Sequence, residues 1–500
     1  MNRSMVIYIL GWVLVIEGVL MSLPLICAII YKESSGIWFL WIMFASIALG
    51  FAITRKKPEN RVFYFREGCV ATALSWILIS LVGALPFYLS GSIPHYIDAL
   101  FETVSGFTTT GSSILTDVEA LPKGMLFWRS FTHWIGGMGV LVFLMAVIKT
   151  SGGSDMNLMR AESPGPSVGK FVPKAMSTAR LLYVIYMVMT IIEIVLLLLG
   201  NMPLFDALTL SFGSAGTGGF AIKNTGCLDY TAYQQWIITI FMILFGVNFN
   251  FYCLLVFKKA KDAFKIEEVR DYFLVILGAI VIIMAKTYDG KMPFLTLLRH
   301  VSFTVGSIIT TTGYATLDFD KWSTAAKVVI VSIMFIGACA GSTGGGIKVS
   351  RFAVAFKTIF KELGTYIYPK SVKKVKMDGK PVDHEVIRGI NVFFVTFLIL
   401  FSLSVLLISF EGKDLVTTFT SVAATINNIG PGLNIVGPTG NFSSFTIFSK
   451  LILIFDMLAG RLELFPMLLL FIRLRGKDFS GKEDKDRIDI PDCGIVILSR

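Results

Sequence analysis

Charged side chains are scarce in this sequence. Lysine, arginine, aspartate and glutamate make up 16% of its 500 residues, whereas about a quarter of an average soluble protein is charged. Hydrophobic residues account for 54% of the chain. This composition leaves too few polar side chains to cover several globular domains, so we predict a polytopic membrane protein.

Signatures of zinc, disulfide and nucleotide sites are also lacking. The six cysteines show no CxxC motif or paired spacing, and the four histidines are scattered. This pattern argues against a zinc site and against a disulfide framework. No Walker or Rossmann glycine motif occurs. An enzyme embedded in the membrane would need a converging set of titratable or nucleophilic residues, and none recurs near the glycine-rich segments. We predict a chain that is not an enzyme and has no cofactor.

Apolar residues gather in ten runs, close to the roughly 20 residues with which an α-helix crosses the hydrocarbon core. The runs cover residues 5–30, 36–54, 69–90, 125–148, 181–200, 235–257, 271–286, 325–356, 389–410 and 448–472. The first is too long for a signal-peptide core and lacks a small-residue cleavage site, so we predict that it is retained.

Basic residues concentrate in every second connection. These basic segments are residues 55–67, 149–180, 258–270 and 357–388, together with the tail that follows 473. Ten spans place all of them on one face, which the positive-inside rule identifies as cytoplasmic. We predict that both termini are cytoplasmic, and that the net charge of +11 reflects topology and not nucleic-acid binding.

Each outer connection contains a short apolar stretch that leads into glycine- and threonine-rich sequence. The four stretches read FETVSGFTTTG (101–111), LTLSFGSAGTGGF (208–220), VSFTVGSIITTTGY (301–314) and TTFTSVAATINNIGPG (417–432). A half-helix followed by irregular backbone is typical of a re-entrant pore loop, which must pack within protein or line a watery cavity. The alternative is four ordinary external turns.

The pattern of one run, one loop and another run occurs four times, which indicates a repeat architecture. We predict an all-α polytopic membrane protein with four helix–pore loop–helix repeats around a pseudo-fourfold pore, preceded by two extra transmembrane helices. The predicted units are residues 1–67 (the first two helices and a basic loop), 68–180, 181–270, 271–388 and 389–475 (pore repeats one to four), and 476–500 (a cytoplasmic tail).

Backbone carbonyls from four such loops suit a dehydrated K⁺ ion, because stacked carbonyl oxygens replace its hydration shell. Glycine permits the positive φ angles that this requires, and the short helices direct their negative C-terminal ends to the centre. The predicted filter residues are Thr108, Thr109, Thr110, Gly111; Ala215, Gly216, Thr217, Gly218; Thr310, Thr311, Thr312, Gly313; Asn427, Asn428, Ile429 and Gly430.

Eight motifs are spread along nearly the whole chain. They are SGFTTTGSS (105–113), RSFTHWIGGMGVLVF (129–143), RAESPGP (160–166), TGGF (217–220), TTTGYAT (310–316), GSTGGGIKVSR (341–351), NNIGPG (427–432) and GRLELFP (460–466). In this order they resemble the TrkH subunit of the Trk/Ktr/HKT superfamily of potassium transporters. The second loop departs most from the family pattern, with Ala215 and Gly216 where the other loops have threonine or asparagine.

The resemblance implies K⁺ uptake across the cytoplasmic, or inner, membrane of a bacterium or archaeon, with one filter glycine from each loop. Serine in the first loop tends toward Na⁺ in this family, so Gly111 favours K⁺. The implied partners are a cytosolic nucleotide-binding regulatory protein of the TrkA type, docked on the basic loops, and a second copy in a homodimer. Channel-like conduction and symport with H⁺ or Na⁺ both stay open.

One glycine-rich segment interrupts the run 325–356. Its glycines and their neighbours are Gly337, Gly341, Ser342, Thr343, Gly344, Gly345 and Gly346. Glycine costs a helix about 1 kcal/mol relative to alanine, so this segment should not be helical. The resemblance implies an intramembrane loop that gates the pore below the filter. The alternative is close helix packing through small residues.

The last run contains charges that are expensive in hydrocarbon. By position, Arg461 in GRLE matches the family's arginine that projects into the pore, and it is the predicted second part of the gate. The alternative is a structural salt bridge of Arg461 with Asp456 or Glu463. Lys348 and Arg351 are predicted to be interfacial anchors.

The first outer segment is acidic, with Asp98, Glu102, Asp117 and Glu119. These residues either concentrate cations at the pore mouth or are solvated charges and helix caps. His133 is predicted to be a packing residue.

A competing function is the K⁺-binding subunit of an ATP-driven potassium pump, which shares the fourfold loop design. The motifs GSTGGGIKVSR and RAESPGP and the two extra front helices favour the uptake protein.

Overall fold

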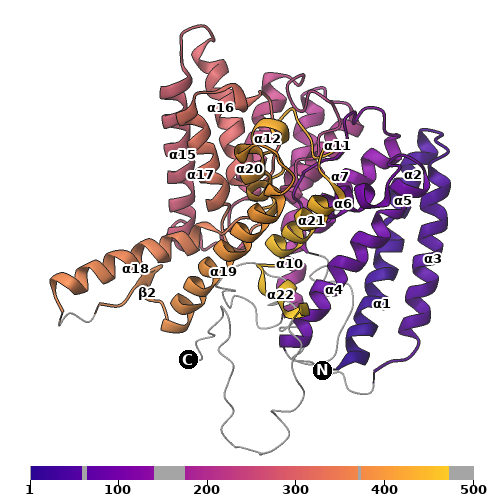
Figure 1. Ribbon diagram of the computed structural model, residues 1–500, viewed down its shortest axis with the longest axis horizontal. Helices are drawn as coiled ribbons and strands as arrows, with labels where there is room; N and C mark the ends of the chain where they lie inside the picture. Colours follow the sequence, from indigo (N-terminus) through magenta and orange to yellow (C-terminus); the bar gives the residue numbers. More distant parts are fainter. Residues whose placement is uncertain (1, 59–64, 140–174, 370–372, 472–500) are drawn as a thin grey trace, which may run out of the picture.

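The computed structural model describes residues 2–58, 65–139, 175–369 and 373–471. The motif RAESPGP, parts of the basic segments, residues 140–148 of the fourth apolar run and the predicted tail lie outside the described residues. The described residues are mostly α-helical (Figure 1), which confirms the predicted fold class. One small hairpin, β1 (Lys376–Met377) and β2 (Lys380–Pro381), pairs antiparallel with Lys376 opposite Pro381.

Each of the ten predicted apolar runs contains helix. The principal helices are α1 (Arg3–Leu20), α2 (Ser22–Ile30), α3 (Gly36–Thr54), α4 (Phe65–Gly83), α5 (Leu85–Leu89), α6 (Tyr96–Phe107), α7 (Lys123–Met138), α10 (Ala175–Leu199), α11 (Leu204–Gly216), α12 (Ala232–Phe245), α13 (Phe249–Val256), α14 (Ala260–Ala263), α15 (Glu267–Thr287), α16 (Phe294–Ile309), α17 (Thr324–Ile336), α18 (Val349–Ile367), α19 (His384–Ser409), α20 (Leu415–Ile426), α21 (Ile447–Arg461) and α22 (Phe465–Phe471).

Several of these helices can cross a membrane by length and composition. Among the described residues, five segments qualify: Arg3–Ile30, Gly36–Thr54, Arg66–Leu89, Arg180–Leu199 and His384–Ser409. The bent pair α12 and α13 adds a sixth candidate. Helices α7, α17 and α21 are shorter, at 16, 13 and 15 residues, and α15 carries charges at both ends.

Helices α1 and α3 cross closely because glycines leave room at their contact. A Cβ added to Gly50 would lie 2.6 Å from both the Gly11 carbonyl oxygen and Val15 Cγ2. Helix α1 also packs against α4. The two extra N-terminal helices are therefore fastened to the outer helix of the first repeat (Figure 1).

The four repeats close into a ring. Each repeat has an outer helix (α4, α10, α15, α19), a short pore helix (α6, α11, α16, α20) and an inner helix (α7, α12, α17, α21). Every inner helix packs against its own pore helix and against the pore helix of the next repeat, and α21 completes the cycle by packing against α6. Four pore helices thus surround one axis.

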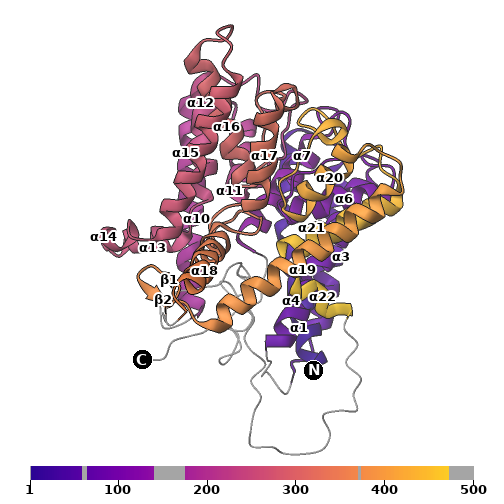
Figure 2. The same ribbon diagram turned by 60° about the vertical axis from the view of Figure 1, so that its left-hand side comes forward.

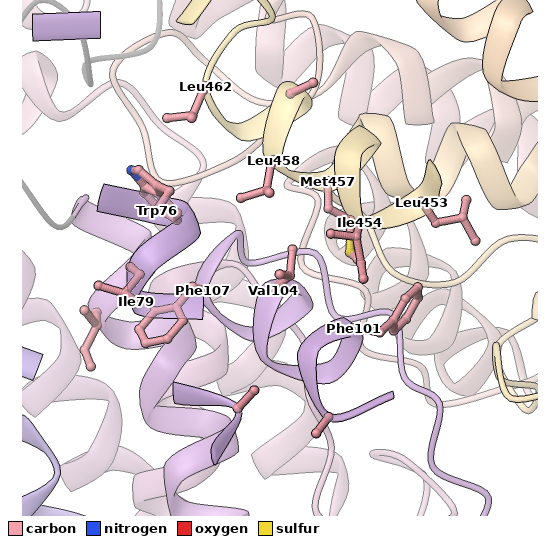
Figure 3. Packing of buried hydrophobic residues seen from close by; sticks show 14 of the residues in the cluster. Trp76, Ile79, Phe101, Val104, Phe107, Leu453, Ile454, Met457, Leu458 and Leu462 are labelled. Atoms are coloured by element: carbon pink, nitrogen blue, oxygen red, sulfur yellow. The ribbon is translucent and has the colours of Figure 1, made fainter. Parts of the chain in front are cut away.

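A hydrophobic cluster joins the first repeat to the fourth, where the ring closes. Figure 3 shows side chains of α4 and α6 facing those of α21 and the residue after it. The labelled members, all buried, are Trp76, Ile79, Phe101, Val104, Phe107, Leu453, Ile454, Met457, Leu458 and Leu462.

Inner helices α12, α17 and α21 stop partway along their apolar runs. The break in 325–356 is the predicted one, whereas 235–257 and 448–472 were predicted to be continuous. The chain bends by 90° between α12 and α13, where Asn248 accepts a hydrogen bond from the Asn250 N–H and caps α13. Helix α17 ends at Gly337, whose φ is +73°. After α21, Glu463 and Leu464 have positive φ. Between α17 and α20, helix α18 extends away from the bundle and α19 returns to it, packing against α20 and α21 (Figures 1 and 2).

Candidate functional site

All four pore helices end in the same backbone turn. In each turn one N–H donates to the carbonyl five residues earlier. The four bonds are Thr110 to Ser105 (2.9 Å), Gly218 to Gly213 (2.8 Å), Thr312 to Ser307 (2.8 Å) and Ile429 to Ala424 (2.8 Å). This shared bonding pattern defines equivalent positions in loops whose sequences differ.

The residue before each of these donors has a left-handed backbone conformation. The four residues and their φ angles are Thr109 (+55°), Thr217 (+54°), Thr311 (+60°) and Asn428 (+55°). A non-glycine residue in this conformation costs on the order of 1–3 kcal/mol and persists where the surroundings enforce it, often at functional sites. Its occurrence at four equivalent positions shows that the loop geometry demands it.

The residue after each donor is a glycine of positive φ. These are Gly111 (+80°), Gly219 (+77°), Gly313 (+87°) and Gly430 (+100°). In the second loop the structure therefore places Gly219, and not Gly218, beside the other three. The predicted register of this loop is wrong by one residue: Gly218 is equivalent to Thr110, and Ala215 lies inside α11.

The four loops touch one another in cyclic order. A Cβ added to each glycine would meet the carbonyl oxygen of the residue that precedes the glycine of the next loop. The four approaches are Gly111 to Gly218, Gly219 to Thr312, Gly313 to Ile429 and Gly430 to Thr110. The carbonyls of Thr110, Gly218, Thr312 and Ile429 thus form a ring that has no room for a Cβ.

A cavity of about 160 Å³ lies on the outer side of this ring. All four positive-φ glycines line it, and Gly218 does not. Its lining also includes Arg129, Lys223 and Asn224. The carbonyl ring therefore opens to a partly polar vestibule.

A buried ion pair supports the first two loops from behind. Arg129 Nε lies 2.6 Å from Glu102 Oε1, and both side chains are almost fully buried. The Arg129 guanidinium also donates to the Ala221 carbonyl at 2.8 Å and lies 3.5 Å from the centre of the Phe220 ring. Glu102 accepts from the Ile114 N–H at 3.0 Å. The pair consequently holds the chain on the outer side of both loops.

The acidic residues of the first outer segment have structural partners. Glu102 is buried against Arg129, and Asp98 pairs with Lys450 at 2.6 Å. Asp117 and Glu119 are exposed and accept hydrogen bonds from Asn224 at 2.8 and 2.9 Å. The side-chain bond from Asn224 is the main cause that lowers the pKa of Asp117. Of the two readings left open above, these contacts favour the structural one.

His133 packs between the first and second loops, in agreement with its predicted role. Its Nδ1 lies 2.7 Å from the Gly106 carbonyl oxygen, and its Nε2 accepts the Phe220 N–H at 3.2 Å. One ring nitrogen therefore donates and the other accepts, which leaves neither available to a metal ion. Among the described residues, no group of three or more His, Cys, Asp or Glu side chains is placed to bind a metal.

The glycine-rich segment lies directly beneath the ring. Its residues 337–348 are not helical, so the alternative of close helix packing does not apply. The Gly345 N–H donates to Thr311 Oγ1 at 2.6 Å. A Cβ on Gly345 would lie 2.5 Å from the Asn427 carbonyl oxygen, and one on Gly344 would lie 2.9 Å from that of Thr310. Only glycine allows the segment to approach the third and fourth loops this closely.

Arg461, the last residue of α21, links the glycine-rich segment to the end of α7. Its guanidinium donates to the Thr343 carbonyl at 2.8 Å and to those of Gly136 and Gly137 at 2.5 and 2.8 Å. The acidic residues of the alternative salt bridge are engaged elsewhere, because Glu463 pairs with Arg351 at 2.6 Å and Asp456 accepts from Ser404. These contacts place a positive charge against the glycine-rich segment.

The prediction that Lys348 and Arg351 are interfacial anchors is wrong. Both are buried. Lys348 Nζ donates to the Gly344 carbonyl, and Arg351 donates to the Ile347 carbonyl at 2.9 Å. The sequence places them just after a glycine-rich stretch at the end of an apolar run, which is a usual position for an anchor. They are buried because the start of α18 packs against the chain after α21 and against α19, where Arg351 pairs with Glu463 and lies over the Phe393 ring.

Comparisons with known proteins agree with this architecture. The family model described as TrkH, cation transport protein, matches residues 37–482. The Trk system potassium uptake protein TrkH of Salmonella typhimurium is 35% identical over 477 residues, 93% of this chain and 97% of that protein. TrkG of Escherichia coli is 32% identical over 485 residues, covering 94% and 99%.

A solved structure is similar as well. The crystal structure of the potassium transporter TrkH from Vibrio parahaemolyticus matches with a TM-score of 0.85 and 28% identity, covering 94% of this chain and 99% of that one. The predicted resemblance is thereby confirmed: the chain belongs to the TrkH family of cation transport proteins.

Proposed function

We propose that this chain mediates K⁺ uptake across the inner membrane of a bacterium, with the backbone carbonyls of its four pore loops as the selectivity filter. The observation that carries the proposal is the cyclic ring formed by the Thr110, Gly218, Thr312 and Ile429 carbonyls. Relatives that span the same length are named potassium uptake proteins. Membership of a transporter family also confirms that the chain is not an enzyme.

The chemistry of the ring suits a weakly hydrated monovalent cation. Carbonyl oxygens replace water around such an ion without adding fixed charge, so that the ion can enter and leave. The four pore helices end at the ring and point their negative C-terminal ends at it. In this proposal the carbonyl oxygens bind the ion without a carboxylate cluster. K⁺ is the transported substrate, and no resident cofactor is required.

We propose the glycine-rich segment and Arg461 as the gate. The segment contacts the third and fourth loops from below, and Arg461 holds it at the Thr343 carbonyl. The segment is a steric obstacle and the guanidinium an electrostatic one, since a nearby positive charge raises the free energy of a passing cation.

Regulation and assembly follow from the same proposal. The basic segments and both termini are proposed to face the cytoplasm, where a nucleotide-binding regulatory protein of the TrkA type docks on them. The chain is proposed to work as a homodimer. Membership of a family of transporters with multiple apolar helices supports a multi-pass membrane location.

Growth and flux measurements test this function. Expression should restore growth of a K⁺-uptake-deficient bacterial strain at low K⁺. Purified protein in liposomes should pass K⁺ and Rb⁺ in preference to Na⁺. Growth that is not restored by protein present in the membrane, with equal K⁺ and Na⁺ flux, would contradict the proposal.

A further inference from the structure

Glu268 is a buried carboxylate that neither the carbonyl ring nor Arg461 accounts for. It lies in the first turn of α15, and the residue is 4% exposed. Burying a carboxylate is costly unless hydrogen bonds compensate for the lost water. The partners of Glu268 therefore indicate what this residue stabilises.

One oxygen of Glu268 joins the two sides of the glycine-rich segment. Oε1 accepts the Ala340 N–H at 2.6 Å and the Ser350 N–H at 3.2 Å. Ser350 lies in the first turn of α18, whose own N-cap residue, Lys348, provides no side-chain cap. A negative charge at a helix N-terminus is favourable, so Glu268 caps α18 from another helix.

The other oxygen reaches the bend between α12 and α13. Oε2 accepts from Asn248 Nδ2 at 3.1 Å, and Asn248 in turn caps α13 through its Oδ1. The bend and the segment also bond directly, because the Phe249 N–H donates to Gly341 and the Cys339 N–H donates to Gly246, at 3.0 and 3.1 Å. One carboxylate thus ties the segment to the starts of α13 and α18, which leave the bundle at the lower end of α15 (Figure 2).

We propose that Glu268 is the positioning residue that holds the glycine-rich segment against the pore loops and couples it to α13 and α18. This inference rests on the proposed gate. Displacement of either helix breaks hydrogen bonds to the same carboxylate that holds Ala340. A displacement of α13 or α18 therefore changes the position of the segment through Glu268, without any contact at the carbonyl ring.

The test compares Glu268→Ala with wild type in two measurements. The first is labelling of Cys339, a buried thiol within the segment, by a small maleimide in a chain whose other cysteines are replaced. The second is K⁺ flux per folded molecule in liposomes. A hydrogen bond to a charged group is worth about a tenfold change in an equilibrium or more, so both rates should rise by roughly tenfold.

A matched control lies next to Glu268. Glu267 pairs with Lys357 of α18 and makes no bond to the glycine-rich segment that the structure describes. Glu267→Gln should leave the labelling of Cys339 unchanged. An equal increase in both variants would show that loosening α18 is sufficient and would overturn the role of Glu268.

A reciprocal exchange keeps the test informative if Glu268→Ala does not fold. Asn248→Asp preserves the cap on α13 but places two acceptors face to face, so labelling and flux should rise. Combining it with Glu268→Gln restores a donor opposite an acceptor, and both rates should return toward wild type. Absence of this rescue contradicts a direct role for the bond.

The two measurements also separate the inference from the gate on which it rests. Unchanged labelling of Cys339 in Glu268→Ala and Asn248→Asp overturns the positioning role, whatever the flux. Faster labelling without faster flux means that the segment has loosened but does not limit transport. That result would overturn the proposed gate and, with it, the functional part of this inference.

Discussion

At the scale of single residues, the positive-φ glycines of the pore loops have least freedom to change. A serine at Gly111 or Gly219 would strain the backbone by on the order of 1–3 kcal/mol and overlap a carbonyl of the neighbouring loop. We expect Gly111→Ser and Gly219→Ser to lower the ratio of K⁺ to Na⁺ flux in liposomes.

The control for these substitutions is a glycine with space around it. A Cβ at Gly278 in α15 would have no neighbour within 4 Å, so Gly278→Ser should keep the wild-type flux ratio. Unchanged ratios for Gly111→Ser and Gly219→Ser in protein that reaches the membrane would refute the filter proposal.

The second prediction at this scale concerns the effect of Arg461 on K⁺ flux. A unit charge about 4 Å from a passing K⁺ costs roughly 4 kcal/mol at an effective dielectric constant of 20, which corresponds to about three decades in rate. Arg461→Ala should therefore raise K⁺ flux per folded molecule and weaken its dependence on a regulatory partner. Arg461→Lys keeps the charge and should raise flux less.

The competing structural role of Arg461 makes a different prediction. Its guanidinium bonds to Thr343, Gly136 and Gly137, so its loss also removes contacts between elements. If stability were its only role, Arg461→Ala would reduce the yield of folded protein and leave normalised flux flat.

At the scale of elements, the buried pair of Glu102 in α6 and Arg129 in α7 couples a pore helix to its inner helix. Removing one partner of a buried ion pair leaves an uncompensated charge and costs about 3–5 kcal/mol. We expect Glu102→Gln to lower the thermal unfolding temperature in detergent by several degrees.

A double substitution checks the cause of that loss. Glu102→Gln combined with Arg129→Met removes both charges and should recover much of the stability, since no uncompensated charge is then left in the interior. A double variant less stable than Glu102→Gln alone would mean that the bond from Arg129 to the Ala221 carbonyl matters more than the pair.

At the scale of the whole molecule, the test is orientation in the membrane. Lys374 and Ser443 are both exposed and belong to connections proposed to lie on opposite faces. Each substitution is made in a variant of the protein that lacks its native cysteines. In intact cells, Ser443→Cys should react with an impermeant thiol reagent and Lys374→Cys should not. The reverse labelling would invert the topology.

The positions of the helices and loops could be predicted from the sequence because the constraint is local. A span needs about 20 apolar residues, and irregular backbone at membrane depth needs glycine and protected surroundings. The ten runs, the four pore loops and the non-helical segment from Gly337 to Gly346 satisfy these requirements within short windows. Such features can be read without knowing which helices touch.

Register within a loop was beyond the sequence. The motif TGGF offers Gly218 and Gly219 as adjacent candidates, and both permit positive φ. The choice depends on the bond from the Gly218 N–H to the Gly213 carbonyl and on the neighbouring Thr312 carbonyl. A partner nearly a hundred residues away in the sequence thus decides the position.

The sequence by itself determined an all-α membrane protein with repeated pore loops, because the bilayer imposes length and hydrophobicity on each segment separately. The tertiary structure alone decided how charge is used. Three buried charged residues show this: Glu102, Glu268 and Lys348. Their partners are Arg129 on α7, the Ala340 N–H in the glycine-rich segment and the Gly344 carbonyl in the same segment. Desolvating a charge is acceptable only where such partners meet it, and their meeting is a property of the assembled ring.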